Sequence, residues 1–432
     1  MQGYQRQVAS ALFDDRHVVH GRAIPSILYW LVALAVGSSF YVMIEPAPTD
    51  LLFLVLLLGL LFKRRIRFPV DLNPILSIGL LTFVAVSALS VLWAEKLAHA
   101  VVFFSVTMYL LISWYLLVTL LANYGTPMWQ LILRAFLVAA AVGAAIGLIT
   151  HFTTALQPIF PTYAERSRGA FKDPNVYAPF LCAALILVMN RLVTRPWRSS
   201  PWLLAMVALV CLYGVEILAA FSRGAYVNLA VSLAVFFGLQ LFALRRKDWL
   251  SRSLVALGAS AAVLLPASLL FLDVTGLEDF LDRRLGLQQY DDKRFGTQAL
   301  VIGMLGEAPF GIGPGHSEIL LPASTHNLYL RVAIENGLLA ALGFYLFLLA
   351  TLRICVLGTL RRNGPFRDVY ACCLAILVGI LVNSLVIDSL HWRHFFLFLA
   401  IPVGLWQHEL WATRAARPVV DLAERPARVK RS

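Results

Sequence analysis

The chain has 432 residues, of which 60% are hydrophobic and only 14% are charged, and its formal net charge is +12. A soluble domain carries about a quarter charged residues, so this composition excludes an ordinary soluble protein. Apolar runs recur from Pro25 to Trp411, and most are close to the length of about 20 residues that a helix needs to cross a bilayer, although the run Leu51–Phe62 is short for a span. Because the runs are continuous rather than alternating, they indicate helices and not the strands of a barrel.

The runs predict an all-α polytopic membrane protein with about twelve transmembrane helices. A polar segment, 1–24, precedes them, and it shows no cleavable signal peptide. The helices are expected at Pro25–Ile44, Leu51–Phe62, Leu72–Trp93, Leu97–Ala122, Leu131–Thr150, Asn175–Val193, Pro201–Ala220, Ala225–Leu244, Leu250–Leu272, Leu328–Leu357, Val369–Ile387 and Phe395–Trp411. Nine helices therefore occupy 25–272, one large loop occupies 273–325, three helices occupy 326–411, and a basic tail follows at 412–432.

Loop charges predict the orientation of these helices. Twelve spans leave both termini on one side, and the loops on that side hold most of the cations. They are Lys63, Arg64, Arg65, Arg67, Arg191, Arg195, Arg198, Arg245, Arg246, Lys247, Arg361, Arg362 and Arg367, with further arginines in the tail. Cytoplasmic loops carry such an excess, so both termini are expected in the cytoplasm and the large loop on the opposite side, which in an inner membrane is the periplasm. The positive charge then reflects topology and anionic lipid heads, and gives no reason to expect nucleic acid.

The opposite, periplasmic side has fewer cations, and topology does not require them there. They are Lys96, Arg166, Arg168, Lys172, Arg223, Arg283, Arg284, Lys293, Arg294 and Arg393, with Arg331 nearby. The first group lies in Arg166-Ser167-Arg168-Gly169-Ala170-Phe171-Lys172, just before Pro174-Asn175, a pair that suits a helix start. Anchoring to lipid headgroups is the alternative to a binding role for this group.

Ser222-Arg223-Gly224 lies in a hairpin so short that it needs no charge. Ser222 is expected to cap the following helix, and Arg223 and the helix N-terminus would then face the same volume, which favours an anion such as phosphate. Glu216 is the single acid inside the preceding helix. Intramembrane acids suggest function, although an ion pair between Glu216 and Arg223 is also open.

The large loop contains one segment with helical periodicity. From Lys293 to Gly306 an amphipathic helix is expected, with Phe295, Ala299, Ile302 and Leu305 on one face and Arg294 near its start. The later run Gly311-Ile312-Gly313-Pro314-Gly315 breaks helix and permits a tight backbone approach.

Two histidine-containing motifs complete the periplasmic side. His326-Asn327 opens the tenth predicted helix, and His391-Trp392-Arg393-His394 forms the last turn on that side. Histidine exchanges a proton near neutral pH, and nearby arginines would keep His326 neutral and able to accept one. Polar surface is the alternative for His326, and an ordinary aromatic belt is the alternative for the last turn.

The order of these motifs resembles the bacterial O-antigen ligase and O-antigen polymerase superfamily. An arginine followed by Gly169 and Pro174-Asn175 comes first. Ser222-Arg223-Gly224, Arg294, the Pro309 to Gly313 run and His326-Asn327 then follow in that order. The similarity covers about Arg166 to Tyr345, together with the helix count and the single large loop. It implies a fold like that of the C-type membrane glycosyltransferases.

The resemblance also implies a reaction. Ligases of the family move a glycan from undecaprenyl diphosphate to the lipid A–core of lipopolysaccharide, without a divalent metal or other cofactor. His326 would be the essential histidine, and Arg168, Arg223 and Arg294 would hold the diphosphate. Arg166 fits the first arginine as well as Arg168 does, although Arg168 is favoured because it adjoins Gly169. Lys172, Asn327, Arg393 and Glu216 are possible supporting residues.

The chemistry follows from these residue types. Fixed guanidiniums can neutralise a leaving diphosphate in place of Mg²⁺, and His326 can take the proton of the attacking sugar hydroxyl. If a metal is needed after all, Asp291-Asp292 are the first candidate ligands. An O-antigen polymerase, which extends lipid-linked glycan, is the nearest alternative, and a transporter of lipid-linked glycan is a more distant one.

Overall fold

The structure, a computed structural model, describes residues 23–61, 66–153, 156–163, 166–194, 200–244, 258 and 289–416. Within these ranges the protein is all-α, with 14 helices. Eight of its helices are long and apolar enough to cross a membrane, by length and composition. The chain therefore has the build of a multi-pass membrane protein. The ninth predicted helix, the first part of the large loop and both polar ends fall outside the described residues.

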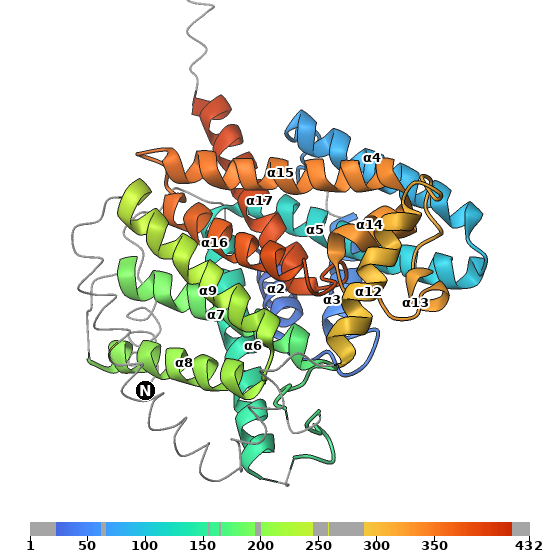
Figure 1. Cartoon of the computed structure of the whole chain (residues 1–432). Helices are drawn as coiled ribbons and strands as arrows, with labels where there is room; N and C mark the ends of the chain where they lie inside the picture. The colour runs from blue at the N-terminus through green and yellow to red at the C-terminus, as the bar shows by residue number, and fades with distance from the viewer. Residues whose placement is uncertain are drawn as a thin grey trace, which may run out of the picture.

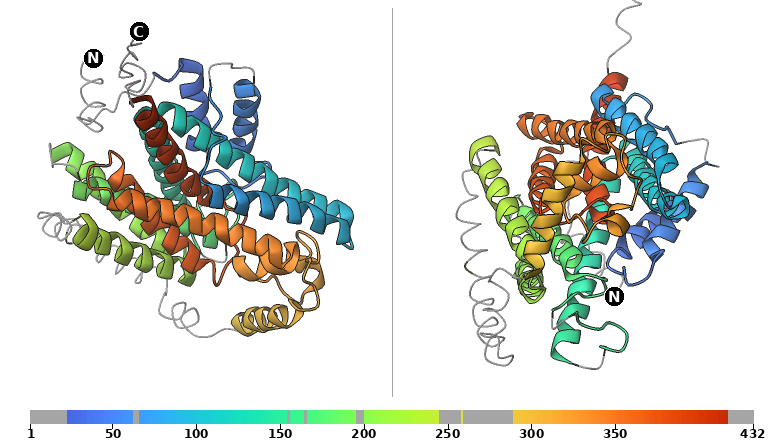
Figure 2. Two further views of the ribbon diagram at one scale, coloured as in Figure 1. Left: turned by 90° about the horizontal axis from the view of Figure 1, so that it is seen from above. Right: turned by 45° about the vertical axis from the view of Figure 1, so that its right-hand side comes forward.

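Long helices run side by side through the molecule (Figures 1 and 2). They are α4 (Pro74–Ser90), α5 (Leu97–Tyr124), α6 (Thr126–Phe152), α7 (Pro174–Thr194), α8 (Ser200–Ala219), α9 (Arg223–Gly238), α15 (Leu338–Leu360) and α17 (Arg393–Ala416). Shorter helices complete the described fold. They are α2 (Ser26–Gly37), α3 (Pro48–Leu61), α12 (Gln289–Met304), α13 (Ser317–Leu320), α14 (Leu328–Asn336) and α16 (Arg367–Asn383). Figure 1 shows α12, α13 and α14 together at one end of the bundle.

The first predicted helix is wrong in length. It ends at Gly37 and not at Ile44, because the backbone amide of Ser38 donates to the carbonyl of Leu34 and closes the last turn. Beyond that turn the chain pairs elsewhere, with the amide of Val42 donating to the carbonyl of Ala170 at 2.8 Å. At 12 residues, α2 is about 18 Å long and falls short of the roughly 30 Å hydrocarbon core.

The tenth predicted helix is two helices. Gly337 separates α14 from α15 with a φ of +93°, which glycine adopts readily. A Cβ at this position would approach the carbonyl oxygen of Pro309 to 2.9 Å, and the amide of Leu338 donates to that same oxygen at 2.9 Å. The break therefore forms where the large loop returns to the bundle.

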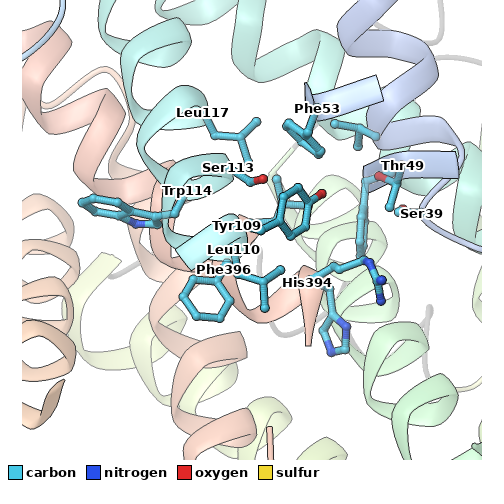
Figure 3. A pocket seen from close by; sticks show the side chains of 14 residues that line it. Ser39, Thr49, Phe53, Tyr109, Leu110, Ser113, Trp114, Leu117, His394 and Phe396 are labelled. Atoms are coloured by element: carbon cyan, nitrogen blue, oxygen red, sulfur yellow. The ribbon is translucent and has the colours of Figure 1, made fainter. Parts of the chain in front are cut away.

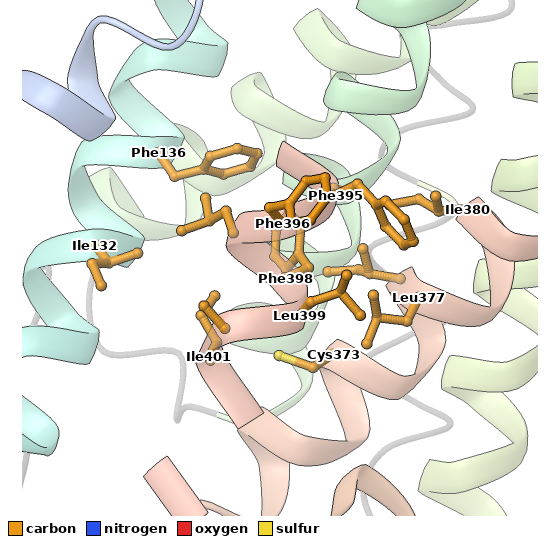
Figure 4. Close-up of a cluster of buried hydrophobic side chains, with 14 of the residues drawn as sticks. Ile132, Phe136, Cys373, Leu377, Ile380, Phe395, Phe396, Phe398, Leu399 and Ile401 are labelled. Atoms are coloured by element: carbon orange, nitrogen blue, oxygen red, sulfur yellow. The ribbon is translucent and has the colours of Figure 1, made fainter. Parts of the chain in front are cut away.

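The core between the helices is aromatic. Figure 4 shows Phe395, Phe396 and Phe398 of α17 between Phe136 of α6 and Ile380 of α16. All five are at most 1% exposed. The Phe136 and Phe398 rings meet edge to face at 5.3 Å, a preferred arrangement for aromatic pairs. This packing holds the helices in fixed relative positions, and the polar groups at both ends of the bundle belong to these helices or to the loops between them.

Each end of the bundle has its own polar network. We call one the His326 end, formed by the connecting residues 38–47, 91–96, 156–163, 166–173, 220–222, 305–327 and 384–392. The other, the opposite end, is held by arginines. There Arg361 pairs with Glu409 at 3.0 Å and Arg414 pairs with Asp71, while Arg67 lies over the ring of Trp411. The helices thus carry the loops predicted to be periplasmic to the first end.

Candidate functional site

Arg166 lies where the loop after α6 meets the turn between α8 and α9. Its Nε donates to the carbonyl of Ala220 at 2.8 Å, and its Nη2 donates to Oδ1 of Asn175 at 2.8 Å. The same Oδ1 accepts a hydrogen bond from Oγ of Ser222 at 2.9 Å. Asn175 therefore couples the first predicted motif to the second.

Arg168, the other arginine of this loop, is held within it. Its Nε donates to the carbonyl of Pro161 at 2.6 Å and its Nη1 to the carbonyl of Lys172 at 2.8 Å. The ammonium of Lys172 pairs with Glu45 at 3.1 Å, and both side chains are about half exposed. Of the two arginines, Arg166 lies beside the start of α9. Phosphate contact by Arg168 stays a prediction.

The predicted cap of α9 is confirmed. Ser222 is the N-cap, and its Oγ accepts from the amide of Ala225 at 3.4 Å. Phe221, just before the cap, has a φ of +44°, which lets α8 turn into α9 without a longer loop. Arg223 is the first residue of α9 and is exposed. It therefore stands at a helix N-terminus, whose amides also favour an anion.

The end of α16 bridges the start of α9 to the start of α14. Gly224 lies so close to Asn383 that a Cβ at this glycine would collide with the amide oxygen of Asn383. The next residue, Ser384, accepts at its carbonyl from the amide of Leu328 at 3.0 Å. The motif that contains Arg223 and the motif that contains His326 are thus joined through adjacent residues of one turn.

His326 has a backbone conformation that non-glycine residues rarely adopt, with φ at +44°. In the described chain only Phe221 shares this feature, and both residues directly precede a helix cap. Asn327 is that cap for α14, because its Oδ1 accepts from the amide of Leu330 at 3.0 Å. Its Nδ2 also donates to the carbonyl of Leu385 at 3.0 Å. Such strain, roughly 1–3 kcal/mol, concentrates at functional sites.

The amphipathic helix predicted in the large loop is confirmed as α12, and its polar face covers His326. Nε2 of Gln298 donates to the carbonyls of Thr325 and His326 at 3.3 and 3.4 Å. Arg294, one turn earlier, is partly buried, and its charge acts on the imidazole of His326. The apolar residues of α12 divide between two faces: Val301 is buried against Leu321 and Ile334, whereas others are exposed. Those exposed are Phe295, Ala299, Leu300 and Ile302.

The imidazole of His326 is held in its neutral form. Burial lowers the pKa of His326 below its ordinary value of 6.5, and the charges of Arg294 and Arg331 lower it further. The carboxylates of Asp388 and Asp173 act in the other direction without reversing the shift. A neutral imidazole at pH 7 has a lone pair that can accept a proton. Asp173 belongs to the loop after α6, so this loop also faces His326.

Arg331 is enclosed by three carboxylates rather than offered to a ligand. Its Nη1 donates to Asp388, its Nε donates to Glu335 at 3.2 Å, and its Nη2 lies 3.1 Å from Glu318. Burial alone would raise the pKa of Asp388, but the charges of Arg331 and His391 and the hydrogen bonds from Leu390 and Arg331 together lower it. The cluster ties α13, α14 and the turn after α16 together beneath His326.

The glycine-rich run, Gly311–Gly315, makes the tight backbone approach predicted for it, and its partner is the end of α14. The amide of Gly313 donates to the carbonyl of Glu335 at 2.9 Å, and the amide of Gly315 donates to Oε2 of Glu335 at 2.8 Å. Both glycines have positive φ, at +102° and +75°. The run therefore fixes the large loop to α14.

Arg393 is bound by Asp50, to which no sequence motif points. Its Nε and Nη2 donate to the two carboxylate oxygens of Asp50 at 2.7 and 2.6 Å, in a bidentate pair. Asp50 also accepts from the amide of Ala47 and the hydroxyl of Tyr109. Its position as the single acid of an apolar run was the signal available in the sequence. The pair joins α17 to α3 and α5.

A small cavity of about 30 Å³ adjoins this ion pair (Figure 3). Four of the residues around it each have a buried side-chain atom without a hydrogen-bond partner among the described residues. These atoms are Oγ of Ser39, Oγ of Ser113, Nε1 of Trp114 and Nε2 of His394. The space suits about two water molecules.

Glu216 is fully buried in α8 among neutral groups. Its Oε2 accepts from Oγ of Ser167 at 2.6 Å and from Oη of Tyr177 at 2.8 Å. A Cβ at Gly147 would collide with this carboxylate, so the glycine makes room for it. The ion pair with Arg223 that the sequence allows is not formed between these described residues. Glu216 instead holds the loop after α6 in place through its hydrogen bond with Ser167.

Over the part of the chain that the structure describes, no three or more His, Cys, Asp or Glu side chains are grouped so that they could hold a metal ion. Asp292 is exposed near the start of α12. Transfer without a metal therefore stays a prediction that needs its own test.

No protein-family model matches the chain, and no curated protein matches its sequence. The case for a function thus depends on the residues and on where the fold places them.

Proposed function

We propose that this protein is an O-antigen ligase, which moves O-antigen glycan from undecaprenyl diphosphate to the lipid A–core of lipopolysaccharide. One observation carries the proposal. A neutral histidine in a strained conformation, His326, lies at a helix start, with Arg294 acting on it from α12. The start of α9, with Arg223, adjoins the same turn. The order of motifs along the chain resembles that of the O-antigen ligase and polymerase superfamily.

The residues divide the chemistry between them. His326 accepts the proton of the acceptor sugar hydroxyl, and the oxygen attacks the anomeric carbon of the donor. The bond from that carbon to the lipid diphosphate breaks, the electron pair leaves with the diphosphate, and the configuration inverts. Arg223 and Arg294 neutralise the charge that develops on the leaving group, with Arg166 or Arg168 as a third cation. Guanidinium suits this role because it binds phosphate oxygens in pairs and stays charged.

The amphipathic α12 fits a lipid-linked donor. Its Arg294 and Gln298 face His326, whereas Phe295 and Ile302 are 50% and 60% exposed. A helix with an exposed apolar face belongs at a membrane surface, with that face among the acyl chains. The diphosphate of a lipid-borne substrate would then arrive at the level of Arg294.

Orientation follows from the positive-inside rule. The opposite end carries Arg67, Arg361, Arg367 and Arg414, which supports a cytoplasmic location for that end. The His326 end would then face the periplasm, where lipid-linked O-antigen and completed lipid A–core meet. Both termini would be cytoplasmic.

Deletion of the coding sequence in its native host tests the ligase against the polymerase. A missing ligase leaves lipid A–core bare while lipid-linked polymer still accumulates. A missing polymerase leaves cores that carry a single repeat unit. Complementation by the intact chain, but not by His326→Asn, is expected to restore full-length lipopolysaccharide. Unchanged lipopolysaccharide after deletion would contradict the proposal.

The pH profile of transfer should depend on Arg294. A general base works in its unprotonated form, so activity falls as the pH drops through the pKa of His326, which lies below 6.5. Arg294→Gln removes a charge that lowers this pKa, so the fall should begin at a higher pH, alongside a reduced maximal rate. The measurement is kcat/KM between about pH 5 and 8.

Lys293→Gln is the matched control, because Lys293 is the exposed neighbouring cation and is not among the charges that act on His326. Its profile should overlay that of the wild type. An acid limb at the same pH in Arg294→Gln and in the wild type would show that Arg294 does not act on the base.

A further inference from the structure

A cavity of about 280 Å³ lies between α6, α7 and α8, away from the groups described above. Two arginines line it, Arg134 and Arg191, and the rest of its wall is apolar. Val138 belongs to this wall and is 61% exposed, so the cavity opens on the outer surface of the bundle. In a membrane that surface meets lipid.

The cavity has a cationic end and an apolar end. Arg191 is in the last turn of α7, and Trp202 is in the first turn of α8, so both lie at the opposite end of the bundle. From the start of α6 at Thr126, Arg134 is about 12 Å along the helix and Ala141 about 22 Å. The cations therefore lie toward the membrane surface, and the apolar wall extends toward the bilayer centre.

The two guanidiniums act on each other as like charges. Both guanidiniums border the same cavity. Like charges brought together away from water repel each other strongly, and an anion between them reverses the sign of the interaction. Phosphate is the anion that paired arginines bind most readily, through bidentate hydrogen bonds.

We propose that this cavity binds an anionic phospholipid, with its phosphate on Arg134 and Arg191 and an acyl chain along Leu137, Ala141, Ala205 and Leu209. The division into a charged outer part and an apolar inner part matches a lipid and not a free phosphate ion. Basic pockets between membrane helices bind anionic headgroups in this way. The site does not depend on the proposed transferase activity.

The test is lipid retention by the purified full-length protein, measured by native mass spectrometry after exchange into mixed micelles. The micelles contain phosphatidylglycerol and phosphatidylcholine in equal amounts. The wild type should retain about 30-fold more phosphatidylglycerol than phosphatidylcholine, because each of the two arginines contributes a factor of about 5. The double variant Arg134→Gln/Arg191→Gln should lose the preference. Arg353→Gln should keep the preference, because Arg353 is an exposed arginine of α15 at the same end of the bundle that does not line the cavity.

A second variant, Ala205→Phe, fills the apolar part and leaves both charges in place. It should lose the lipid as well, which also separates lipid from inorganic phosphate. Competition by millimolar phosphate in the wild type, with Ala205→Phe unaffected, would mean that the site takes only a phosphate ion. Equal retention of both lipids by the wild type, or equal losses in Arg353→Gln and the double variant, would overturn the proposal.

Discussion

His326→Asn is expected to lower the rate of glycan transfer by a factor of about 10²–10⁴, the usual contribution of a general base. Asparagine tolerates the left-handed backbone that His326 adopts at φ +44°, so the variant keeps the local fold. It cannot accept a proton at neutral pH. The measurement is single-turnover transfer to rough lipopolysaccharide, with donor binding followed separately.

His326→Ala and His151→Ala serve as comparisons. Alanine at 326 should lose the same activity and also lower stability, since it keeps the backbone strain without an amide side chain. His151, in the last turn of α6, has no part in the proposed chemistry, and its replacement should leave transfer intact. Wild-type transfer rates in His326→Asn would refute the base role of His326.

Arg331→Leu is expected to lower the free energy of unfolding by about 3–5 kcal/mol, because it leaves buried carboxylates without their cation. Arg331 is 6% exposed and Glu335 is 1% exposed, so solvent cannot replace the lost partner. Transfer should fall too, since this cluster supports the start of α14, where His326 is held. Thermal unfolding in detergent measures the first effect, and transfer by the folded fraction measures the second.

Neutralising the carboxylates that pair with Arg331 shows whether the stability loss comes from unpaired charge or from lost packing. Adding Glu335→Gln and Asp388→Asn to Arg331→Leu should recover part of the stability, since no unpaired charge then remains at those positions. Arg353→Leu, at an exposed arginine of α15, should change stability by less than about 1 kcal/mol. If Arg331→Leu has the same unfolding temperature as the wild type, the ion cluster does not stabilise this end of the bundle.

The long helices could be predicted from the sequence because each apolar run is both continuous and near the thickness of a bilayer. The cap at Ser222 and the helix α12 could also be predicted, since both depend on local pattern. The break at Gly337 could not. Apolar residues continue on both sides of it, and the break depends on the backbone of Pro309, which lies far away in the chain.

Pairings between distant residues are the part of the site that sequence could not supply. Asp50 and Arg393 are 343 positions apart, and neither residue indicates the other. Asn175, which connects Arg166 to Ser222, and Asn383, which lies against Gly224, are neutral amides of a kind common at helix ends. In the sequence Arg331 is one of several cations on the same side, and only the fold shows that three carboxylates surround it.

Transfer by the purified protein in excess EDTA tests the central claim most directly. The substrates are undecaprenyl-diphosphate glycan and rough lipopolysaccharide, and the product is glycan-bearing lipid A–core. We expect full activity without metal in the wild type, and losses of about 10²–10³ in Arg223→Gln and in Arg294→Gln. Activity that vanishes in EDTA and returns with Mg²⁺ would contradict the account, and Asp291-Asp292 would then be the first ligands to test.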